Sequence, residues 1–168
     1  YKIQYATENP GAEASWTDVK VFNNRPAEIT EVIAFDTPVN ARYIRLYIGS
    51  HTPDDPILTS IPEWNSVSIY ELEVYGEIDA NYQDPQENVA LNKTGTASST
   101  ETADFAAAKA LDGDTSSRSS RWSSAEADGP HWIYVDLGKE MDVQTVRLYW
   151  ETRKASNYTI STAAGEHT

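Results

Sequence analysis

Hydrophobic and polar residues alternate with a period of two along most of this chain. The alternating segments are rich in β-branched and aromatic residues, a pattern typical of strands that bury one face. Turn-forming residues separate them, as at 8–15 and at Asp36-Thr37-Pro38. The segments that we expect to be strands are 1–7, 16–22, 28–35, 41–48, 66–76, 131–139, 143–151 and 157–163.

Helical periodicity is nearly absent from the sequence. One short helix is expected from Asp104 to Ala110, ended by Gly113. The proline-rich stretch 51–66 is incompatible with regular structure. Many short strands joined by long loops favour an all-β fold, either a β-sandwich or a jelly roll.

The strand IYELEVYGE, residues 69–77, ends before the middle of the chain and is followed by a polar run. A chain of 168 residues corresponds to about one domain, so this ending divides a single domain. We therefore distinguish residues 1–77, a linker at 78–87 and residues 88–168. The pattern Y-x-I-x-x-A also occurs twice, at 1–6 and at 158–163, although alone such a short match is weak.

Acidic residues outnumber basic ones by 26 to 13, which gives a net charge of −13. This charge repels phosphate backbones and argues against nucleic-acid binding. Because the charges are scattered, the simpler interpretation is an acidic, solvated surface. The chain has no cysteine, which excludes disulfides, zinc-thiolate sites and cysteine nucleophiles. No apolar run approaches the roughly 18 residues of a membrane span.

Several segments resemble, in order and spacing, the discoidin family, also called coagulation factor V/VIII C-type domains. In the second half of the chain they are NVALNKTGTASS, AAKALDGD, SRWSS, HWIYVDLGK and VQTVRLYWE. In the first half they are YKIQYA, SWTDV, ARYIRLYI and IYELEVYGE, which resemble the other end of the same family. The family 32 carbohydrate-binding modules of secreted bacterial glycosidases are the most similar members. The resemblance implies a discoidin-like β-sandwich jelly roll, of the kind found in galactose-binding domains, and a secreted or cell-surface location.

The resemblance also implies that the two halves of the module stand in reversed order. The chain is then either a circularly permuted module or a slice through two tandem modules, and the repeated Y-x-I-x-x-A pattern marks the seam. A half sandwich alone would expose its core and its strand edges. We therefore expect residues 1–77 and 88–168 to fold together as one sandwich. The alternative is a dimer or filament that combines halves from different chains.

The LDGD sequence at 111–114 resembles the loop with which family members hold a structural calcium ion. The resemblance implies these ligands: the Lys109 carbonyl, Asp112, Asp114, a hydroxyl from Ser117 or Ser120, and Glu71. A hard cation prefers such a mixture of carboxylate and carbonyl oxygens. The alternative is an Asp-Gly turn whose side chains accept hydrogen bonds from backbone amides.

The tryptophans divide into core and loop positions. Trp16, Trp122 and Trp132 are expected in the core. Trp64 lies in the proline-rich loop, where its ring could stack on the apolar face of a pyranose. The alternative for Trp64 is that it closes the open end of the core. Trp150 is expected to pack in the core as well.

The loop that follows Trp150 is the other part of the expected sugar site. The residues expected to contact sugar beside Trp64 are Glu151, Arg153, Asn157 and His131. Arg153 and Asn157 could substitute for the Arg and Asn of galactose-binding members, and the alternative for His131 is a structural role. Galactose-binding members place an Arg at the strand end, where this chain has Trp150. This difference favours β-glucan or chitosan over galactosides, because Glu151 can pair with a sugar hydroxyl or a glucosaminium. The alternative for Glu151 is a solvated loop charge.

The sequence contains no HExxH, GxSxG or glycine-rich phosphate motif. Asp54-Asp55 or Glu71 with Glu73 could imitate a glycosidase pair. Asp54 and Asp55 are adjacent, and adjacent acids in an extended chain point to opposite faces. Glu71 and Glu73 share a face, but the family resemblance already assigns Glu71 to the calcium site. We therefore expect a non-catalytic carbohydrate-binding module that tethers a secreted, multimodular glycosidase or surface protein to glycan. The alternatives are a discoidin-type adhesion domain for protein or lipid, a catalytic β-sandwich, and a spacer that binds nothing.

Overall fold

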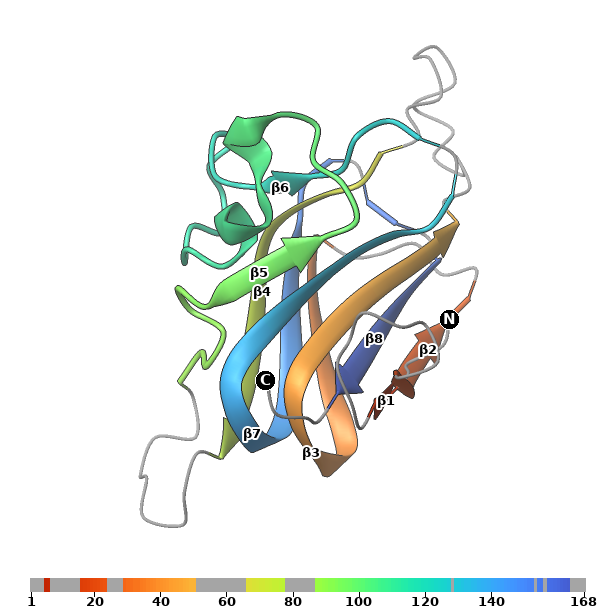
Figure 1. Ribbon diagram of the computed structural model, residues 1–168, viewed down its shortest axis with the longest axis vertical. Coiled ribbons are helices and arrows are strands. Elements are labelled where there is room, and N and C mark those ends of the chain that lie inside the picture. Colours follow the sequence, from red (N-terminus) through yellow and green to blue (C-terminus); the bar gives the residue numbers. More distant parts are fainter. Residues whose placement is uncertain are drawn as a thin grey trace.

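The computed structural model describes residues 5–6, 16–23, 29–50, 66–77, 87–127, 129–152, 154–155 and 157–163. Figure 1 shows an all-β molecule whose strands form two packed layers. The strands are β1 (Tyr5–Ala6), β2 (Thr17–Phe22), β3 (Thr30–Ser50), β4 (Ser68–Glu77), β5 (Thr94–Ala97), β6 (Trp122–Ser123), β7 (His131–Trp150) and β8 (Asn157–Ala163). The expected all-β sandwich is confirmed.

Two long strands, β3 and β7, connect the layers. They pair antiparallel over most of their length and bend together at one end of the molecule (Figure 1). We expected each to be two separate strands, divided in β3 at Asp36-Thr37-Pro38. Instead, the strands continue through the bend. The pairing shifts register between Ala34 and Val39, and such irregularities let a strand pair turn without ending.

A partly buried polar contact lies at the bend of β7. Arg42 donates two hydrogen bonds to the Asp136 carboxylate. Its Nε lies 2.9 Å from Oδ1, and its Nη2 lies 3.1 Å from Oδ2. Asp136 Oδ1 also accepts a hydrogen bond from the Gly138 amide at 2.8 Å. Gly138 has a φ of +89°, a conformation that glycine adopts without steric cost.

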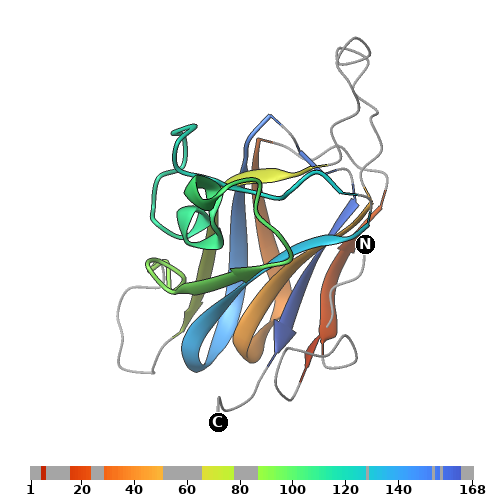
Figure 2. The same ribbon diagram turned by 45° about the horizontal axis from the view of Figure 1, so that its top comes forward.

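Each layer combines strands from both sides of the polar stretch 78–87. One layer contains β5, the first half of β7, the second half of β3, then β8 and β2. The other contains β6, β4, the second half of β7 and the first half of β3. Figure 2 shows the two layers with their strands joined through the bends. The described segments before and after residue 78 therefore share one sheet network.

The described end of the first Y-x-I-x-x-A copy, β1, lies beside the second copy, β8. β1 pairs parallel to β8, with Tyr5 opposite Thr162 and Ala6 opposite Ala163. This register is the same as that of the sequence repeat, in which Ala6 corresponds to Ala163. β8 itself lies between β3 and β2.

The main core fills the space between the layers. Trp122 and Trp150 are among its largest fully buried side chains, as expected. Along β7 the inward positions alternate, with Ile133, Val135 and Leu137 all buried. This period of two is the pattern from which the strand was predicted.

Trp132 does not belong to this core, contrary to expectation. It is half-buried and stacks on Tyr134, with ring centroids 5.8 Å apart and planes 16° apart. Because side chains alternate across a strand, both rings face away from the core that Ile133 enters. Trp16 is buried as expected, but it packs with Tyr43 in a second, smaller cluster on this outer face.

The expected helix from 104 to 110 is also different in the structure. Two 3₁₀ helices, η2 (Ala103–Phe105) and η3 (Ala107–Ala110), replace it, because Ala106 is extended with ψ of 161°. A 3₁₀ turn places residues i and i+3 on one face, and both Ala107 and Ala110 are buried. Within the parts of the chain described here, no helix has the length and hydrophobicity to cross a membrane.

Candidate functional site

Glu71 is a fully buried carboxylate in the middle of β4. It lies opposite Tyr149 of β7, is 0% exposed, and has no hydrogen-bond partner on either carboxylate oxygen among the described residues. Burial raises the pKa of Glu71 to about 7, and the Asp112 and Glu73 carboxylates add to the rise. The backbone amides of Gly113 and Asp112 oppose the rise, although neither meets both the distance and the angle of a hydrogen bond to Glu71. A buried carboxylate without a partner is unfavourable, so this position would be stabilised by a cation.

The segment after η3 is shaped by the Asp112 side chain. Its Oδ1 accepts a hydrogen bond from the Asp114 amide at 3.1 Å, and its Oδ2 accepts one from the Ser120 hydroxyl. The Lys109 ammonium lies 3.9 Å from the same Oδ2. Gly113, between the two aspartates, has a φ of +86°. The Asp-Gly-Asp sequence thus makes a tight turn that requires glycine at its centre.

Asp114 closes the next turn of this loop. Its Oδ1 accepts hydrogen bonds from the Ser117 amide at 2.9 Å and the Ser116 amide at 3.1 Å. These two bonds lower the pKa of Asp114. The Ser117 hydroxyl is 2.8 Å from that of Ser119. This is the backbone-capping arrangement that the sequence left open as the alternative to a metal site.

The structure brings some of the expected metal ligands together and separates others. Glu71 and Asp112 interact electrostatically, and Ser120 binds Asp112. Asp114 and Ser117 form the neighbouring turn. Within the described residues, no group of three His, Cys, Asp or Glu side chains could hold a metal ion. A cation here would therefore need hydroxyl and backbone carbonyl oxygens as well, a mixture that calcium accepts.

A second group of expected residues lies at the loop end of the sandwich, opposite the bends of β3 and β7. His131 begins β7 opposite Ile48, and Asn157 begins β8 opposite Ser50. His131 is buried and Asn157 is half-buried. Both are therefore positioned by a strand of the sheet rather than by a loop alone.

Glu151 lies at the same end, immediately after β7. Its backbone amide donates to the Ser68 carbonyl at 3.2 Å, and its Oε2 accepts from the Thr152 hydroxyl at 2.6 Å. The side chain is half-buried. Trp64 and Arg153, the other two expected sugar contacts, lie outside the described residues.

An aromatic cluster underlies this end. The Trp150 ring is 1% exposed and meets Tyr158 edge-on at 5.2 Å between centroids. Tyr158 also stacks with Phe22 of β2 at 5.5 Å. The expectation that Trp150 packs in the core is confirmed, and its ring supports the loop that follows.

The part of the chain from β5 through the Asp-Gly-Asp loop, β6 and β7 to β8 matches a known family. Residues 94–166 match the F5/8 type C domain. The discoidin resemblance is thus confirmed for this segment, and the family consists of discoidin-type binding domains. No curated protein matches the sequence.

The F5/8 type C segment contains the aspartate loop and three of the loop-end residues named above, but not Glu71. Glu71 comes from β4, which precedes the segment in the chain. It reaches the aspartate loop because β4 pairs with β7 and contacts η3. The two neighbouring carboxylates therefore come from different parts of the chain: Asp112 lies inside the F5/8 type C segment and Glu71 lies outside it.

The Glu73 carboxylate, the second acid of the Glu71/Glu73 pair, binds two other side chains. Its Oε2 accepts hydrogen bonds from the Tyr75 hydroxyl at 2.8 Å and from Arg147 at 3.2 Å. Burial raises the pKa of Tyr75 to about 12, and the bond to Glu73 adds to the rise. Sequence analysis missed this network, although the period of two along β4 places Glu73 and Tyr75 on one face.

Proposed function

We propose that this chain is a non-catalytic carbohydrate-binding module that tethers a larger protein, a secreted multimodular glycosidase or a surface protein, to glycan. The observation that supports it best is the gathering of His131, Glu151 and Asn157 at one end of a rigid sandwich. Loops held by a rigid scaffold are the usual place of a ligand site. The F5/8 type C match supports binding as the general role.

The proposed recognition combines an aromatic surface with a few polar groups. Trp64 would stack on a pyranose face. Glu151 would accept hydrogen bonds from sugar hydroxyls or from a glucosaminium. Asn157 and Arg153 would form hydrogen bonds that select the orientation of the sugar hydroxyls. We expect β-glucan or chitosan before galactosides. Binding at such a shallow site is weak, and tandem copies in the parent protein would raise the effective concentration.

We further propose that the aspartate loop holds a structural calcium ion. The Lys109 carbonyl, Glu71, Asp112, Asp114 and a hydroxyl of Ser117 or Ser120 would be its ligands. The residues fit this role because the Glu71 carboxylate is buried without a hydrogen-bond partner among the described residues. A bound calcium ion would supply the positive charge that this carboxylate lacks.

The reversed order of the halves is part of the same proposal. We infer that residues 1–77 and 88–168 form one permuted sandwich within a single chain, since strands from both sides pair along β3 and β7. Light scattering on a size-exclusion column tests this inference. A monomer of 18.7 kDa is expected, whereas a dimer or a concentration-dependent series would favour exchange of halves between chains.

Intrinsic tryptophan fluorescence tests the sugar-binding proposal. The titration would use β-glucan oligomers, chitosan oligomers, N-acetylglucosamine, galactose and lactosamine, each with calcium and with chelator. A saturable change with one sugar class, lost in Trp64→Ala, is the expected result. No change with any sugar, together with no retention on insoluble glycan, would contradict the proposal and leave a spacer as the better interpretation.

A second candidate function has one specific observation in its favour. Ile29 is 70% exposed, and its carbonyl accepts a hydrogen bond from the Trp150 amide at 2.9 Å, which places it at the loop end. An exposed apolar side chain there suits an adhesion domain that inserts into lipid. Cosedimentation with vesicles of phosphatidylserine and phosphatidylcholine, using Ile29→Ser as the comparison, would distinguish this function from glycan binding.

A further inference from the structure

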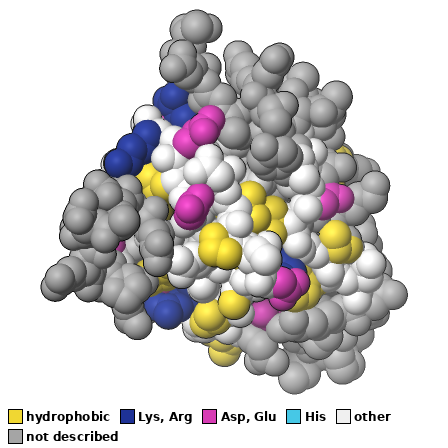
Figure 3. All heavy atoms as spheres, turned by 90° about the horizontal axis from the view of Figure 1, so that it is seen from below, with side chains coloured by type: hydrophobic (Ala, Val, Ile, Leu, Met, Phe, Trp, Pro, Cys, Tyr) yellow, Lys and Arg dark blue, Asp and Glu magenta, His cyan; other side chains and the backbone are white. Residues whose placement is uncertain are grey.

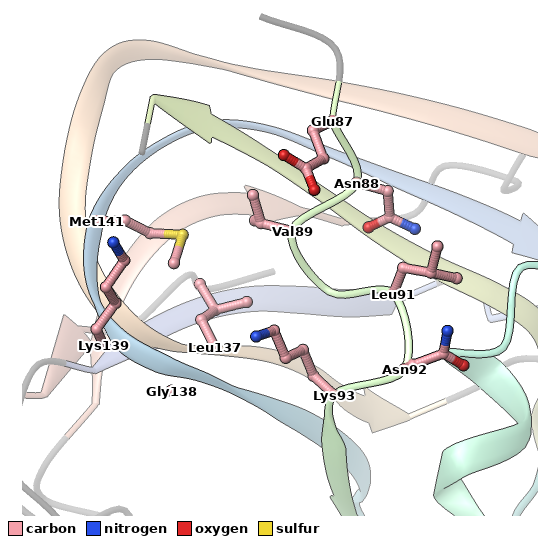
Figure 4. Close-up of a pocket in the computed structure, with 10 residues that line it drawn as sticks. All are labelled: Glu87, Asn88, Val89, Leu91, Asn92, Lys93, Leu137, Gly138, Lys139 and Met141. Carbon is pink, nitrogen blue, oxygen red and sulfur yellow. The ribbon is translucent and has the colours of Figure 1, made fainter. Parts of the chain in front are cut away.

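A pocket of about 520 Å³ opens at the end of the molecule opposite the loop end, where β3 and β7 bend. One wall is the segment 87–93, which leads into β5, and the other is the β7 bend at 137–141 (Figure 4). The volume lies within the range of pockets that hold small ligands. None of the described residues expected to bind sugar or metal lines this pocket.

The floor of the pocket is aliphatic. Val89, Leu137 and Met141 line it and are buried, and Leu91 at its edge is 43% exposed. Seen from this end, apolar side chains reach the surface in several places between acidic and basic ones (Figure 3). None of the described residues that line the pocket is aromatic, so they offer no surface on which a pyranose usually stacks.

Both walls are held by hydrogen bonds. The Asn88 side-chain carbonyl accepts from the Val74 and Ala90 amides, each at 3.1 Å, and the Val89 amide donates to the Val74 carbonyl at 2.8 Å. On the other wall, the Gly138 amide is bound by Asp136. A ligand would therefore enter a preformed site with little ordering of the backbone.

The charges at the mouth favour an anion. Lys93 and Lys139 come from opposite walls, and both are exposed (Figure 4). Neither forms an ion pair with any residue that the structure describes. Two ammonium groups that pair with no described acid make this opening locally positive in a chain with a net charge of −13. Glu87 lies at the far end of the segment from Lys93 and would disfavour a second negative charge on the ligand (Figure 4).

We propose that this pocket binds a monocarboxylate with a short aliphatic chain, independently of the sugar-binding function. The chain would lie on Val89, Leu137 and Met141, and the carboxylate would pair with Lys93 and Lys139. Burial of the alkyl chain supplies most of the affinity, and the two lysines select the charged head group.

The chain offers a direct probe, because Met141 is its single methionine. With a ¹³C-methyl label on methionine, one NMR resonance reports on this pocket. Titration with octanoate is expected to shift that resonance saturably. Uncharged 1-octanol, at equal concentration, is expected to bind about tenfold more weakly, because it cannot pair with the lysines.

Substitution of the lysines tests the charge selection without altering the core. The double variant Lys93→Gln/Lys139→Gln is expected to weaken octanoate binding about tenfold and to bind octanol as the parent does. Lys154→Gln, an exposed lysine at the other end of the sandwich, is the matched control and should leave both affinities unchanged. Absence of a Met141 shift with octanoate, or equal octanoate affinity in the double variant, would overturn the proposal. A saturable shift with glucuronate but not octanoate would overturn it in favour of an acidic sugar.

Discussion

The Glu71 carboxylate lies beside Asp112, although the two residues come from different sides of the polar stretch 78–87. Glu71 belongs to β4, which is paired with β7, and Asp112 follows η3, which contacts β4. Two carboxylates brought together in this way repel each other, and one of them is fully buried. The buried Glu71 carboxylate is therefore unfavourable in the folded protein, and a cation bound between Glu71 and Asp112 would stabilise it.

Calcium is expected to stabilise the protein through this site. At a calcium concentration of about 100 times the Kd, binding adds about 2.7 kcal/mol to the free energy of unfolding, or roughly 5–10 °C in Tm. Differential scanning fluorimetry in calcium and in chelator measures the shift. Glu71→Gln should lose the calcium response, whereas Glu126→Gln, an exposed acid, should keep it. Equal Tm values for the parent in calcium and in chelator would refute the metal assignment.

In the metal-free protein, Glu71 should make stability depend on pH. Its pKa is raised from 4.5 to about 7 in the folded state, so the folded state binds this proton more tightly than the unfolded state. The contribution is fully present below about pH 4.5 and is lost as the pH rises through about 7. Its full size is about 3 kcal/mol.

Urea denaturation between pH 4.5 and pH 8, in chelator, measures this effect as the difference between the parent and Glu71→Gln. The variant should lose less stability than the parent as the pH rises, because an amide does not titrate. Parallel pH profiles for the two proteins would show that Glu71 is not the group responsible.

Asp136 should matter for stability because it organises the bend of β7. Asp136→Ala removes the bidentate contact with Arg42 and the acceptor for the Gly138 amide, and should cost about 1–3 kcal/mol in urea denaturation. Asp142→Ala is the matched control, since the Asp142 side chain accepts, from the described residues, only an exposed hydrogen bond from Asn40. We expect the control to stay within about 0.5 kcal/mol of the parent. Similar losses in both variants would show that the bend contact has no special role.

Gly76 should not tolerate a side chain, because β4 and β7 approach closely there. A Cβ at Gly76 would collide with the backbone carbonyl of Asp142, which cannot rotate away. Gly76→Ala is therefore expected to lower the free energy of unfolding by about 1–3 kcal/mol. At Gly49 the nearest atom to an added Cβ is a Tyr47 ring carbon at 3.8 Å, so Gly49→Ala should be nearly neutral. A tolerated Gly76→Ala would mean that the two strands can separate at this point.

The sequence by itself determined the all-β class, most strand positions and the Asp-Gly turn at 112–113. These follow from local rules, because the period of two marks a half-buried strand wherever it lies. The same rules failed where a neighbour decides the outcome. The sequence predicts Trp132 in the core, yet its side chain lies on the outer face of β7 and stacks on Tyr134. The sequence predicts a strand end at Asp36-Thr37-Pro38, yet β3 is paired with β7 on both sides of these residues.

Only the tertiary structure decided which side chains meet. The sequence alone does not show that Glu71 is buried without a partner among the described residues, because that depends on η3 and its loop lying against β4. Nor does it show that Glu73 is bound by Arg147. The pocket beside Met141 likewise exists only because the bend of β7 lies next to the segment 87–93. Such contacts join residues distant in the chain, and their energies depend on three-dimensional placement rather than on any local pattern.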